Sequence, residues 1–415
     1  MAVDACGAET GLISIDQALQ EVLTHTQALG SEKLSLSQAY NRYLTEDIYS
    51  KIELPLFSQS AVDGYAICAN RDLQQGTTFE LIGEIRAGQK VNFTLNEGQA
   101  VRIFTGTKIP FGTTTIARQE IVKLLEDQLI QLSSDLKLHE DIRKQGEEIG
   151  IGQCLAEKGQ QLTVGAIAAL SMAGVQQVSV SCYPKIAVVI TGDEVAKSIE
   201  DFQEGKIFDA NAPLLEAWFA EQGQQIKIYH VTDDISAVKT LLTDLSQSHD
   251  VVLSTGGVSV GAYDFIRPVA LQIGFEQIFW KVKQKPGKPM LFAKLQRPDQ
   301  SYCYLMGLPG NPAAVYVGAQ IYLKTLLRCL QGKKHLPQWF SAQMAHPVKP
   351  DHRERFVRMS AEFKDGYLQV KSLGKQQSHM LSNLMLANCL VRLPAAQEIV
   401  EGQIVSGIFI DTPFV

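Results

Sequence analysis

Glycines and a carboxylate follow an apolar run in VVLSTGGVSVGAYD, residues 251–264. The run ends in Gly256 and Gly257, Gly261 follows, and Asp264 comes three residues later. Glycine lets a backbone approach a ligand closely and direct N–H groups at an anion, whereas a carboxylate repels anions. The two features are compatible if the ligand is a phosphate that binds together with a metal cation.

Three further polar clusters also follow apolar runs, namely Thr191–Glu194, Asp233–Asp234 and Leu308–Pro312. If these runs are strands of a parallel sheet, all four clusters lie at its carboxyl edge, where open α/β sheets bind their ligands. A single TGG motif would be weak evidence, but four clusters at one edge favour a binding site.

The clusters divide by charge into phosphate and metal candidates. Gly256, Gly257, Ser259 and Gly261 are the candidates for the phosphate-bearing ligand. Glu194, Asp234 and Asp264 offer hard oxygen ligands of the kind that Mg²⁺ takes together with substrate phosphates. Asp233 and Asp234 could equally cap the helix that follows them. The histidines form no HxH or HExxH group and the chain has no GxxxxGK[ST], which disfavours catalytic zinc and a P-loop.

Two other stretches combine turn residues with groups suited to chemistry. Lys285 and Lys288, in KQKPGKP, form either a proline-stiffened turn or a rigid cationic loop for an oxyanion, and the second interpretation is favoured. Asp63, in AVDGYA, and Thr105, in IFTGT, would be ordinary turn residues if nothing else were known.

Alternating strand and helix patterns over residues 184–330 predict a three-layer α/β domain with a mainly parallel sheet. Short alternating runs from about residue 45 to 145 predict a β-rich insertion, and the chain beyond about 335 predicts a small all-β domain. Helices are predicted to begin at the capping residues Ser14, Thr163 and Asn211. A long helix is predicted over residues 313–332.

The composition limits the class of protein. The 415 residues are 45% hydrophobic and 20% charged with a net charge of −6, which disfavours nucleic acid as a partner. Seven isolated cysteines indicate reduced thiols in a cytoplasm rather than a disulfide framework. We expect no signal peptide and no membrane span, because there is no basic, apolar leader and no apolar run of 18 residues.

Seven motifs in order give the chain a specific resemblance. They are SAVDGYA, RIFTGTKIP, GEEIGIG, TGDEV, STGGVSVGAYD, KPGKPMLF and GLPGNPAA. In this order and spacing the chain resembles the molybdopterin molybdenumtransferase family, known as MoeA and represented by the E domain of gephyrin. The match covers essentially the whole chain.

The resemblance implies an enzyme of molybdenum cofactor biosynthesis that inserts molybdate into adenylated molybdopterin and releases AMP, with Mg²⁺. It implies catalytic roles for six residues: Asp63, Thr105, Glu148, Glu194, Asp234 and Asp264. Pro289 and Pro309 fall in loops of the family pattern. Lys285, Lys288, Arg353 and Ser378 become candidates for binding molybdate.

The resemblance also implies four domains and a dimer. The domains are an elongated discontinuous one (1–60 and 145–182), the β-rich insertion (61–144), the α/β molybdopterin-binding domain (183–332) and a C-terminal β-barrel (333–415). Family members form elongated homodimers, with the site between the α/β domain of one subunit and the insertion of the other. Transient complexes with the molybdopterin adenylyltransferase and with acceptor molybdoenzymes are expected.

Two alternatives remain open. The isolated α/β domain also resembles a molybdopterin adenylyltransferase, although the extra domains and TGDE favour insertion. A non-enzymatic scaffold of the gephyrin type is the third possibility, which the retained acidic residues disfavour.

Overall fold

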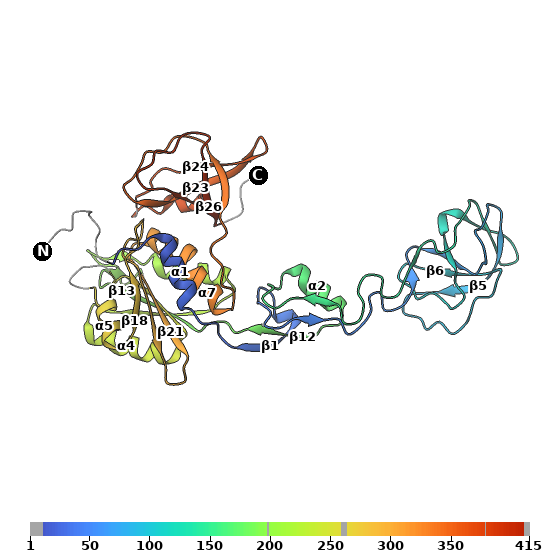
Figure 1. The fold of residues 1–415 in the computed structure, drawn as a ribbon, viewed down its shortest axis with the longest axis horizontal. Helices are drawn as coiled ribbons and strands as arrows, with labels where there is room; N and C mark the ends of the chain where they lie inside the picture. The colour runs from blue at the N-terminus through green and yellow to red at the C-terminus, as the bar shows by residue number, and fades with distance from the viewer. Residues whose placement is uncertain (1–10, 197–198, 259–263, 378, 411–415) are drawn as a thin grey trace. The chain divides into compact units, whose positions relative to one another are not determined.

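The computed structural model describes residues 11–196, 199–258, 264–377 and 379–410. The chain forms two compact units: a large unit of Met1–Glu32 with Ser181–Val415, and a small unit of Lys33–Val180. In Figure 1 the colour bar identifies the small unit as the blue-to-green stretch between these segments. Each unit is described by itself.

The large unit is built on a six-stranded sheet with the order β16-β13-β17-β21-β20-β18. Its strands are β13 (Ile186–Thr191), β16 (Ile226–Val231), β17 (Val251–Thr255), β18 (Glu276–Trp280), β20 (Leu291–Gln296) and β21 (Tyr302–Leu308). The pairings from β16 to β21 are parallel, whereas β20 and β18 are added antiparallel, so the sheet is mixed.

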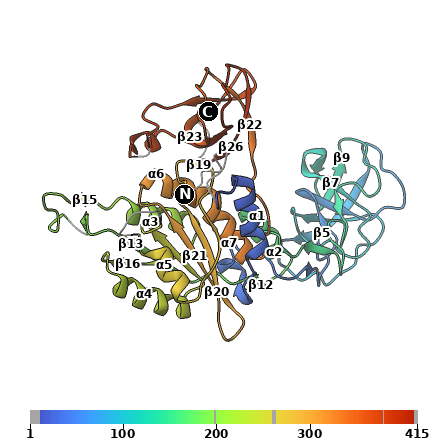
Figure 2. The same cartoon turned by 60° about the vertical axis from the view of Figure 1, so that its left-hand side comes forward.

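Helices pack on both faces of this sheet. Successive strand side chains point to opposite faces, and they accordingly belong to two different hydrophobic clusters. Val188 and Leu253 pack with α1 (Ile15–His25), α3 (Asn211–Glu221), α6 (Pro312–Gly318) and α7 (Lys324–Leu330). Val189 and Val252 pack with α4 (Ile235–Ser248) and α5 (Ile266–Gln272). Figure 2 shows these two groups of helices on either side of the strands.

Most predicted helix starts are confirmed. Ser14 forms a capping box with Gln17, and Thr163 caps α2 (Val164–Met172). The prediction that Asn211 caps α3 is wrong: Asn211 is its first residue, and the carboxylate of Asp209 accepts the N–H groups of the first turn. The predicted long helix contains a π-helical segment, η3 (Ala319–Leu323), between α6 and α7.

The C-terminal part of the large unit forms a closed barrel. Its strands are β22 (Phe340–Met344), β23 (Glu354–Lys364), β24 (Tyr367–Ser372), β25 (Cys389–Leu393) and β26 (Ile404–Phe409), with the short helix η4 (Ser382–Met385) before β25. Pairing of β23 with β25 closes the ring that runs through β24, β22 and β26. A short outer strand, β19 (Gln284–Lys285), pairs in parallel with the start of β23.

The small unit contains a second six-stranded sheet, in the order β7-β4-β6-β5-β9-β8. Its strands are β4 (Gly64–Ile67), β5 (Thr78–Ile85), β6 (Gln99–Ile103), β7 (Thr115–Arg118), β8 (Val122–Leu124) and β9 (Leu129–Leu132). The remaining short elements of this unit are η1 (Leu36–Gln38), β2 (Ile48–Tyr49), β3 (Gln59–Ser60), η2 (Gln119–Ile121), β10 (Ile142–Arg143) and β11 (Cys154–Ala156). A further two-stranded sheet pairs β1 (Ser31–Ser35) with β12 (Gln177–Ser181).

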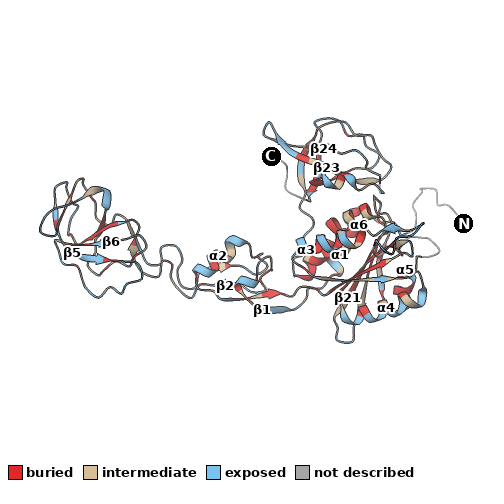
Figure 3. Ribbon diagram, turned by 180° about the vertical axis from the view of Figure 1, so that it is seen from behind, coloured by how far each residue is buried: buried red, intermediate tan, exposed pale blue. Residues whose placement is uncertain are grey.

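The observed architecture is thus multidomain, with a mixed α/β sheet, a β-rich insertion and a closed C-terminal barrel. Figure 3 colours β21 of the central α/β sheet mainly as buried and much of α4 as exposed. The six cysteines among the described residues are free thiols. In the same residues no helix combines the length and apolarity that crossing a membrane requires. The four-domain division stays a prediction, since the chain separates into two units here.

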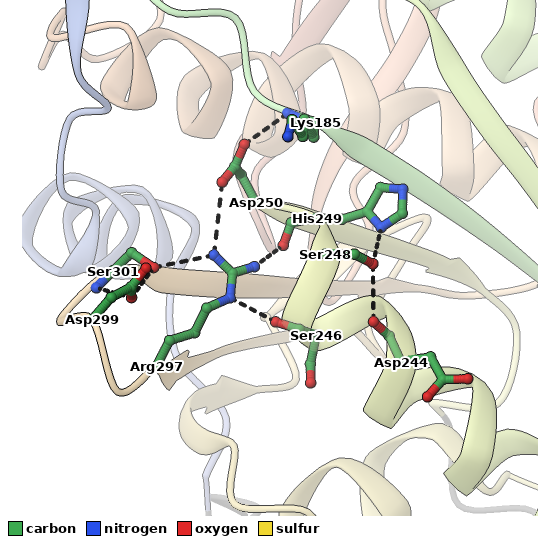
Figure 4. A network of polar contacts seen from close by, with 9 residues as sticks. All are labelled: Lys185, Asp244, Ser246, Ser248, His249, Asp250, Arg297, Asp299 and Ser301. Carbon is green, nitrogen blue, oxygen red and sulfur yellow. Dashed lines mark hydrogen bonds and ion pairs between the residues drawn. The ribbon is translucent and has the colours of Figure 1, made fainter.

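Arg297 stabilises the end of the central sheet at which the parallel strands begin (Figure 4). Its Nε donates to the carbonyl of Ser246 at 2.8 Å, and one Nη donates to the carbonyl of His249. The guanidinium also lies 3.8 Å from the carboxylate of Asp250, whose other oxygen accepts the N–H of Lys185 at 2.8 Å. One side chain thereby joins the end of α4 to the start of β17 and β13.

Replacing Arg297 with Met should destabilise the large unit by about 2 kcal/mol, because buried carbonyls lose charged donors. The three tryptophans, Trp218, Trp280 and Trp339, all lie in the large unit, so their fluorescence during urea unfolding reports on that unit. The control Lys206→Met removes a surface ion pair with Asp201 and should cost less than about 1 kcal/mol. Equal unfolding midpoints for the two variants would contradict this role of Arg297.

Candidate active site

Three loops meet at the carboxyl edge, the edge of the central sheet at which β13, β17 and β21 end. The hydroxyl of Thr191 donates to the carbonyl of Thr255 at 3.3 Å, and the N–H of Gly256 donates to the carbonyl of Leu308 at 2.9 Å. A Cβ added to Gly310 would lie 3.6 Å from the Cα of Gly256. The predicted polar clusters therefore lie together at one edge.

Gly256 and Gly257 are required at this edge by both conformation and space. Their φ angles are +91° and +67°, in the region that favours glycine. A Cβ on Gly256 would approach the Thr191 hydroxyl to 2.5 Å, and one on Gly257 would approach Ile266 to 2.6 Å. Ser259 and Gly261, predicted to belong to the same loop, lie outside the described residues.

Carboxylates gather beside these glycines. The N–H of Asp233 donates to a carboxylate oxygen of Asp193 at 3.4 Å. Burial raises the pKa of Asp233, and the negative charges of Asp193, Glu194 and Asp264 raise it further. Two of the three predicted metal ligands, Glu194 and Asp264, are therefore close enough to repel this carboxylate.

Asp234, the third predicted metal ligand, is a helix cap. One of its carboxylate oxygens accepts the N–H of Ala237 at 2.8 Å, in the first turn of α4. Of the two interpretations left open by the sequence, capping is confirmed. Among the described residues, no group of three or more His, Cys, Asp or Glu side chains has an arrangement that could hold a metal ion.

A pair that the sequence did not indicate joins the residue Asp209, just before α3, to β16. Nε2 of His230, in β16, lies 3.1 Å from Oδ2 of Asp209, while Oδ1 of Asp209 accepts the N–H groups of Asn211 and Ala212. The amide of Asn211 donates to the carbonyl of Gly310 at 2.8 Å, which joins this pair to the carboxyl edge. The pattern DAN before a helix is the available signal, although the sequence alone predicts from it a cap by Asn211.

The predicted cationic loop lines a cavity of about 520 Å³ between the sheet and the barrel of the large unit. The lining residues are Lys285, Pro286, Gly287, Lys288, Pro289, Pro309, Asn311, Ala314, Val348, Arg353, Arg355, Phe356, Val357, Ser372, Gln376 and Gln377. Five predicted residues are thus brought together, namely Lys285, Lys288, Pro289, Pro309 and Arg353. Ser378 lies outside the described residues.

Asp351 orients two of these cations. Nζ of Lys285 donates to its carboxylate at 2.9 Å, and the backbone N–H of Arg353 donates to its other oxygen at 3.2 Å. The hydrogen bond from Lys285 is the main cause that lowers the pKa of Asp351 to about 2. The Nη1 of Arg353 donates to the carbonyl of Gln284 at 3.3 Å, so both cations are tied to one short strand.

Sequence reasoning missed Arg355, Gln376 and Gln377, which also line the cavity. Arg353 and Arg355 are two positions apart where β23 begins, so strand alternation places them on one face. That spacing in the stretch RER was a usable signal. The Nε atoms of both arginines are buried and have no hydrogen-bond partner within the described residues.

Asp63 and Thr105, both predicted as turn residues, lie next to each other in the small unit. The carboxylate of Asp63 accepts both the backbone N–H and the hydroxyl of Thr105, each at 2.8 Å. These bonds lower the pKa of Asp63, whose side chain is exposed and ionised. Glu148 is exposed in the same unit, and in the described part of the chain no hydrogen bond joins its carboxylate to Asp63 or Thr105.

Three family models match successive parts of the chain. Residues 13–174 match the "MoeA N-terminal region (domain I and II)", residues 187–328 a "probable molybdopterin binding domain", and residues 341–409 the "MoeA C-terminal region (domain IV)". A molybdopterin molybdenumtransferase from Haemophilus influenzae is 34% identical over 392 residues, covering 92% of this chain and 94% of the relative. One from Staphylococcus aureus is 30% identical over 389 residues, covering 92% and 91%.

A solved structure has the same fold. The molybdopterin biosynthesis MoeA protein from Pyrococcus horikoshii superposes with a TM-score of 0.78 at 26% identity, covering 96% of this chain and all of that one. The chain therefore belongs to the MoeA family, and the resemblance stated from its motifs is confirmed.

Replacing Gly256 with Ala should disturb the carboxyl edge, because the new Cβ meets the Thr191 hydroxyl and the φ of +91° is strained. We expect a loss of about 1–3 kcal/mol in the free energy of unfolding of the large unit. Gly310→Ala is the matched control, since its Cβ makes only an ordinary contact and should be nearly neutral. Tryptophan fluorescence in urea measures both, and a Gly256→Ala variant as stable as wild type would refute the close packing.

The Lys285–Asp351 pair should contribute stability that depends on pH. Because the folded pKa of about 2 lies below the ordinary 3.8, the contribution is complete above about pH 4 and is lost as the pH falls toward 2. Lys285 is half exposed, so we expect at most about 1 kcal/mol. Urea midpoints measured at several pH values should fall less steeply for Asp351→Asn than for wild type across this window. Identical slopes would show that the pair contributes nothing.

Proposed function

We propose that this chain is a molybdopterin molybdenumtransferase that inserts molybdate into adenylated molybdopterin and releases AMP in a Mg²⁺-dependent reaction. One observation carries the proposal: a cation-lined cavity adjoins a carboxyl edge that carries glycines and acids. Pro309 and Asn311 line the cavity, and Gly310 between them contacts Gly256 at the edge. An oxyanion and a phosphate ester can therefore occupy neighbouring positions in one unit.

The cavity has the chemistry of an oxyanion site. Molybdate is a dianion with four oxygen acceptors, and Lys285, Lys288 and the two arginines supply donors with positive charge. Arg353 and Arg355 both line the cavity, so their guanidinium groups can offer charged N–H donors to such a ligand. Asp351 accepts a hydrogen bond from the Nζ of Lys285 and so fixes this cation at the cavity wall.

The carboxyl edge has the chemistry for a phosphate that binds with a divalent cation. Burial first, and then repulsion from neighbouring carboxylates, raises the pKa of Asp233. A cation would relieve the repulsion, and carboxylate oxygens are ligands that Mg²⁺ accepts. Glu194 and Asp264 would hold it, with Asp234 at the edge of the set because its Oδ1 caps α4. The ion would supply electrophilic polarisation of the phosphoryl group. Backbone N–H groups around Gly256 and Gly257 would bind the phosphate oxygens.

The remaining residues fit a site that two subunits complete. Two hydrogen bonds from Thr105 keep the exposed carboxylate of Asp63 ionised. An exposed, ionised carboxylate of this kind is suited to contact a ligand. We assign Asp63, Thr105 and Glu148 catalytic roles in a site of the partner subunit of a homodimer. We place the enzyme in the cytoplasm. Transient complexes with the adenylyltransferase and with acceptor molybdoenzymes would deliver substrate and receive product.

The test is release of AMP from adenylated molybdopterin on adding molybdate and Mg²⁺ to the purified full-length chain. Glu194→Gln should reduce the rate roughly 100-fold, since a charge that binds the cation is lost while the shape is kept. Glu216→Gln, which neutralises an exposed carboxylate on α3, is the matched control and should keep the wild-type rate.

Three outcomes would count against the proposal. No AMP release by the folded wild-type chain would contradict the reaction, and release that is indifferent to chelation of Mg²⁺ would contradict the metal. Consumption of ATP with unmodified molybdopterin would instead identify an adenylyltransferase.

A further inference from the structure

Arg358 is a buried cation with no assigned role. Only 3% of the residue is exposed, although it lies in β23 directly after Val357, which lines the oxyanion cavity. Burial lowers the pKa of its guanidinium, so keeping the charge there costs free energy. Hydrogen bonds to the guanidinium can offset this cost, so its bonding partners are of interest.

The guanidinium donates to the backbone of one loop. It bonds the carbonyls of Met380 at 2.7 Å, Gln377 at 3.1 Å and Lys375 at 3.2 Å. The loop is the one that brings Gln376 and Gln377 to the cavity wall.

The side chain of Gln376 locks this arrangement from the other side. Its amide donates to the carbonyls of Arg358 at 2.7 Å and Leu373 at 2.8 Å, while its oxygen accepts the backbone N–H of Arg358 at 3.2 Å. Asn383 donates to the carbonyls of Gly374 at 2.8 Å and Lys375 at 3.1 Å. The loop's carbonyls are thus directed at buried donors.

Peptide planarity then fixes where the N–H groups point. In a trans peptide the N–H points opposite to the C=O of the preceding residue. Because the carbonyls of Gly374 and Lys375 face Arg358 and Asn383, the N–H groups of Lys375 and Gln376 face the opposite way. Lys375 has a φ of +59°, the left-handed conformation found in anion-binding backbone nests. Neither N–H donates to an acceptor among the described residues.

Resting on the function proposed above, we infer that Arg358 is a positioning residue for the oxyanion cavity. By binding the carbonyl of Lys375 it holds the N–H of Gln376, a residue that lines the cavity, as a donor to the tetrahedral oxyanion. Its side chain does not line the cavity, so it acts through the loop rather than on the ligand.

Arg297 supplies a matched control. It also donates to backbone carbonyls, those of Ser246 and His249, but at the opposite edge of the central sheet. Arg358→Lys and Arg297→Lys each keep the positive charge and lose the planar, multiply donating group. Both variants should lose stability, whereas only one should lose oxyanion binding.

The experiment measures binding of molybdate alone to the full-length chain by calorimetry, with urea unfolding as the second readout. Arg358→Lys should raise the dissociation constant for molybdate about tenfold. The lysine keeps the positive charge but cannot make the hydrogen bonds that hold the loop, so the loop N–H is no longer fixed as a donor. Arg297→Lys should change it less than about twofold. In the AMP assay, Arg358→Lys should raise the KM for molybdate and leave kcat within about threefold.

The outcomes separate this inference from the function on which it rests. If wild type does not bind molybdate, the cavity assignment fails and the role of Arg358 fails with it. If wild type binds and Arg358→Lys binds equally well, or if both variants weaken binding in proportion to their lost stability, only the positioning role is overturned.

Discussion

The parallel pairing of β19 with the start of β23 is the constraint on which the candidate site depends. It sets Lys285 opposite Arg355 and Gln284 opposite Glu354, and so joins the α/β part of the large unit to the barrel. Gln284 is buried and accepts the hydroxyl of Tyr322 at 2.5 Å, while its amide donates to the carbonyl of Gly287 at 3.2 Å. Two residues of strand thereby determine the position of the cationic loop.

Charge separation within the large unit follows from this arrangement. Cations come from β19 and the loop after it and from the start of β23, whereas the acids follow β13, β16 and β17 at the carboxyl edge. The Pro309–Asn311 segment lies where the two groups meet. Opposite charges on adjoining surfaces suit a substrate that carries a phosphate with its cation at one end and receives an oxyanion at the other. In a chain with a net charge of −6, such a local concentration of positive charge favours binding of an anion that the molecule as a whole repels.

The sequence predicted those parts of the fold and site that depend on local chemistry. Strand and helix alternation gave the α/β sheet, because a periodicity needs only nearby residues, and the glycines and lysines were found by their types. Long-range packing was not predictable in this way. Nothing near Arg355 or Gln376 in the sequence indicates that β23 would meet a loop some seventy residues earlier. Asn211 was misassigned for a similar reason: its amide bonds Gly310, which is remote in sequence, and so Asp209 takes over the cap.

Arg297 and Arg358 show one physical principle used for two purposes. Each guanidinium donates to several backbone carbonyls that secondary structure leaves unpaired. An ionised carboxylate could not replace it, because a carboxylate only accepts hydrogen bonds. At Arg297 the carbonyls belong to the end of α4, so the result is a closed helix end and a stable sheet. At Arg358 the carbonyls belong to a loop at the cavity wall. Because these carbonyls point toward Arg358, the N–H groups of the same peptides point away from it. A buried cation can thus shape an anion site without touching the anion, since it decides which face of the backbone the ligand meets.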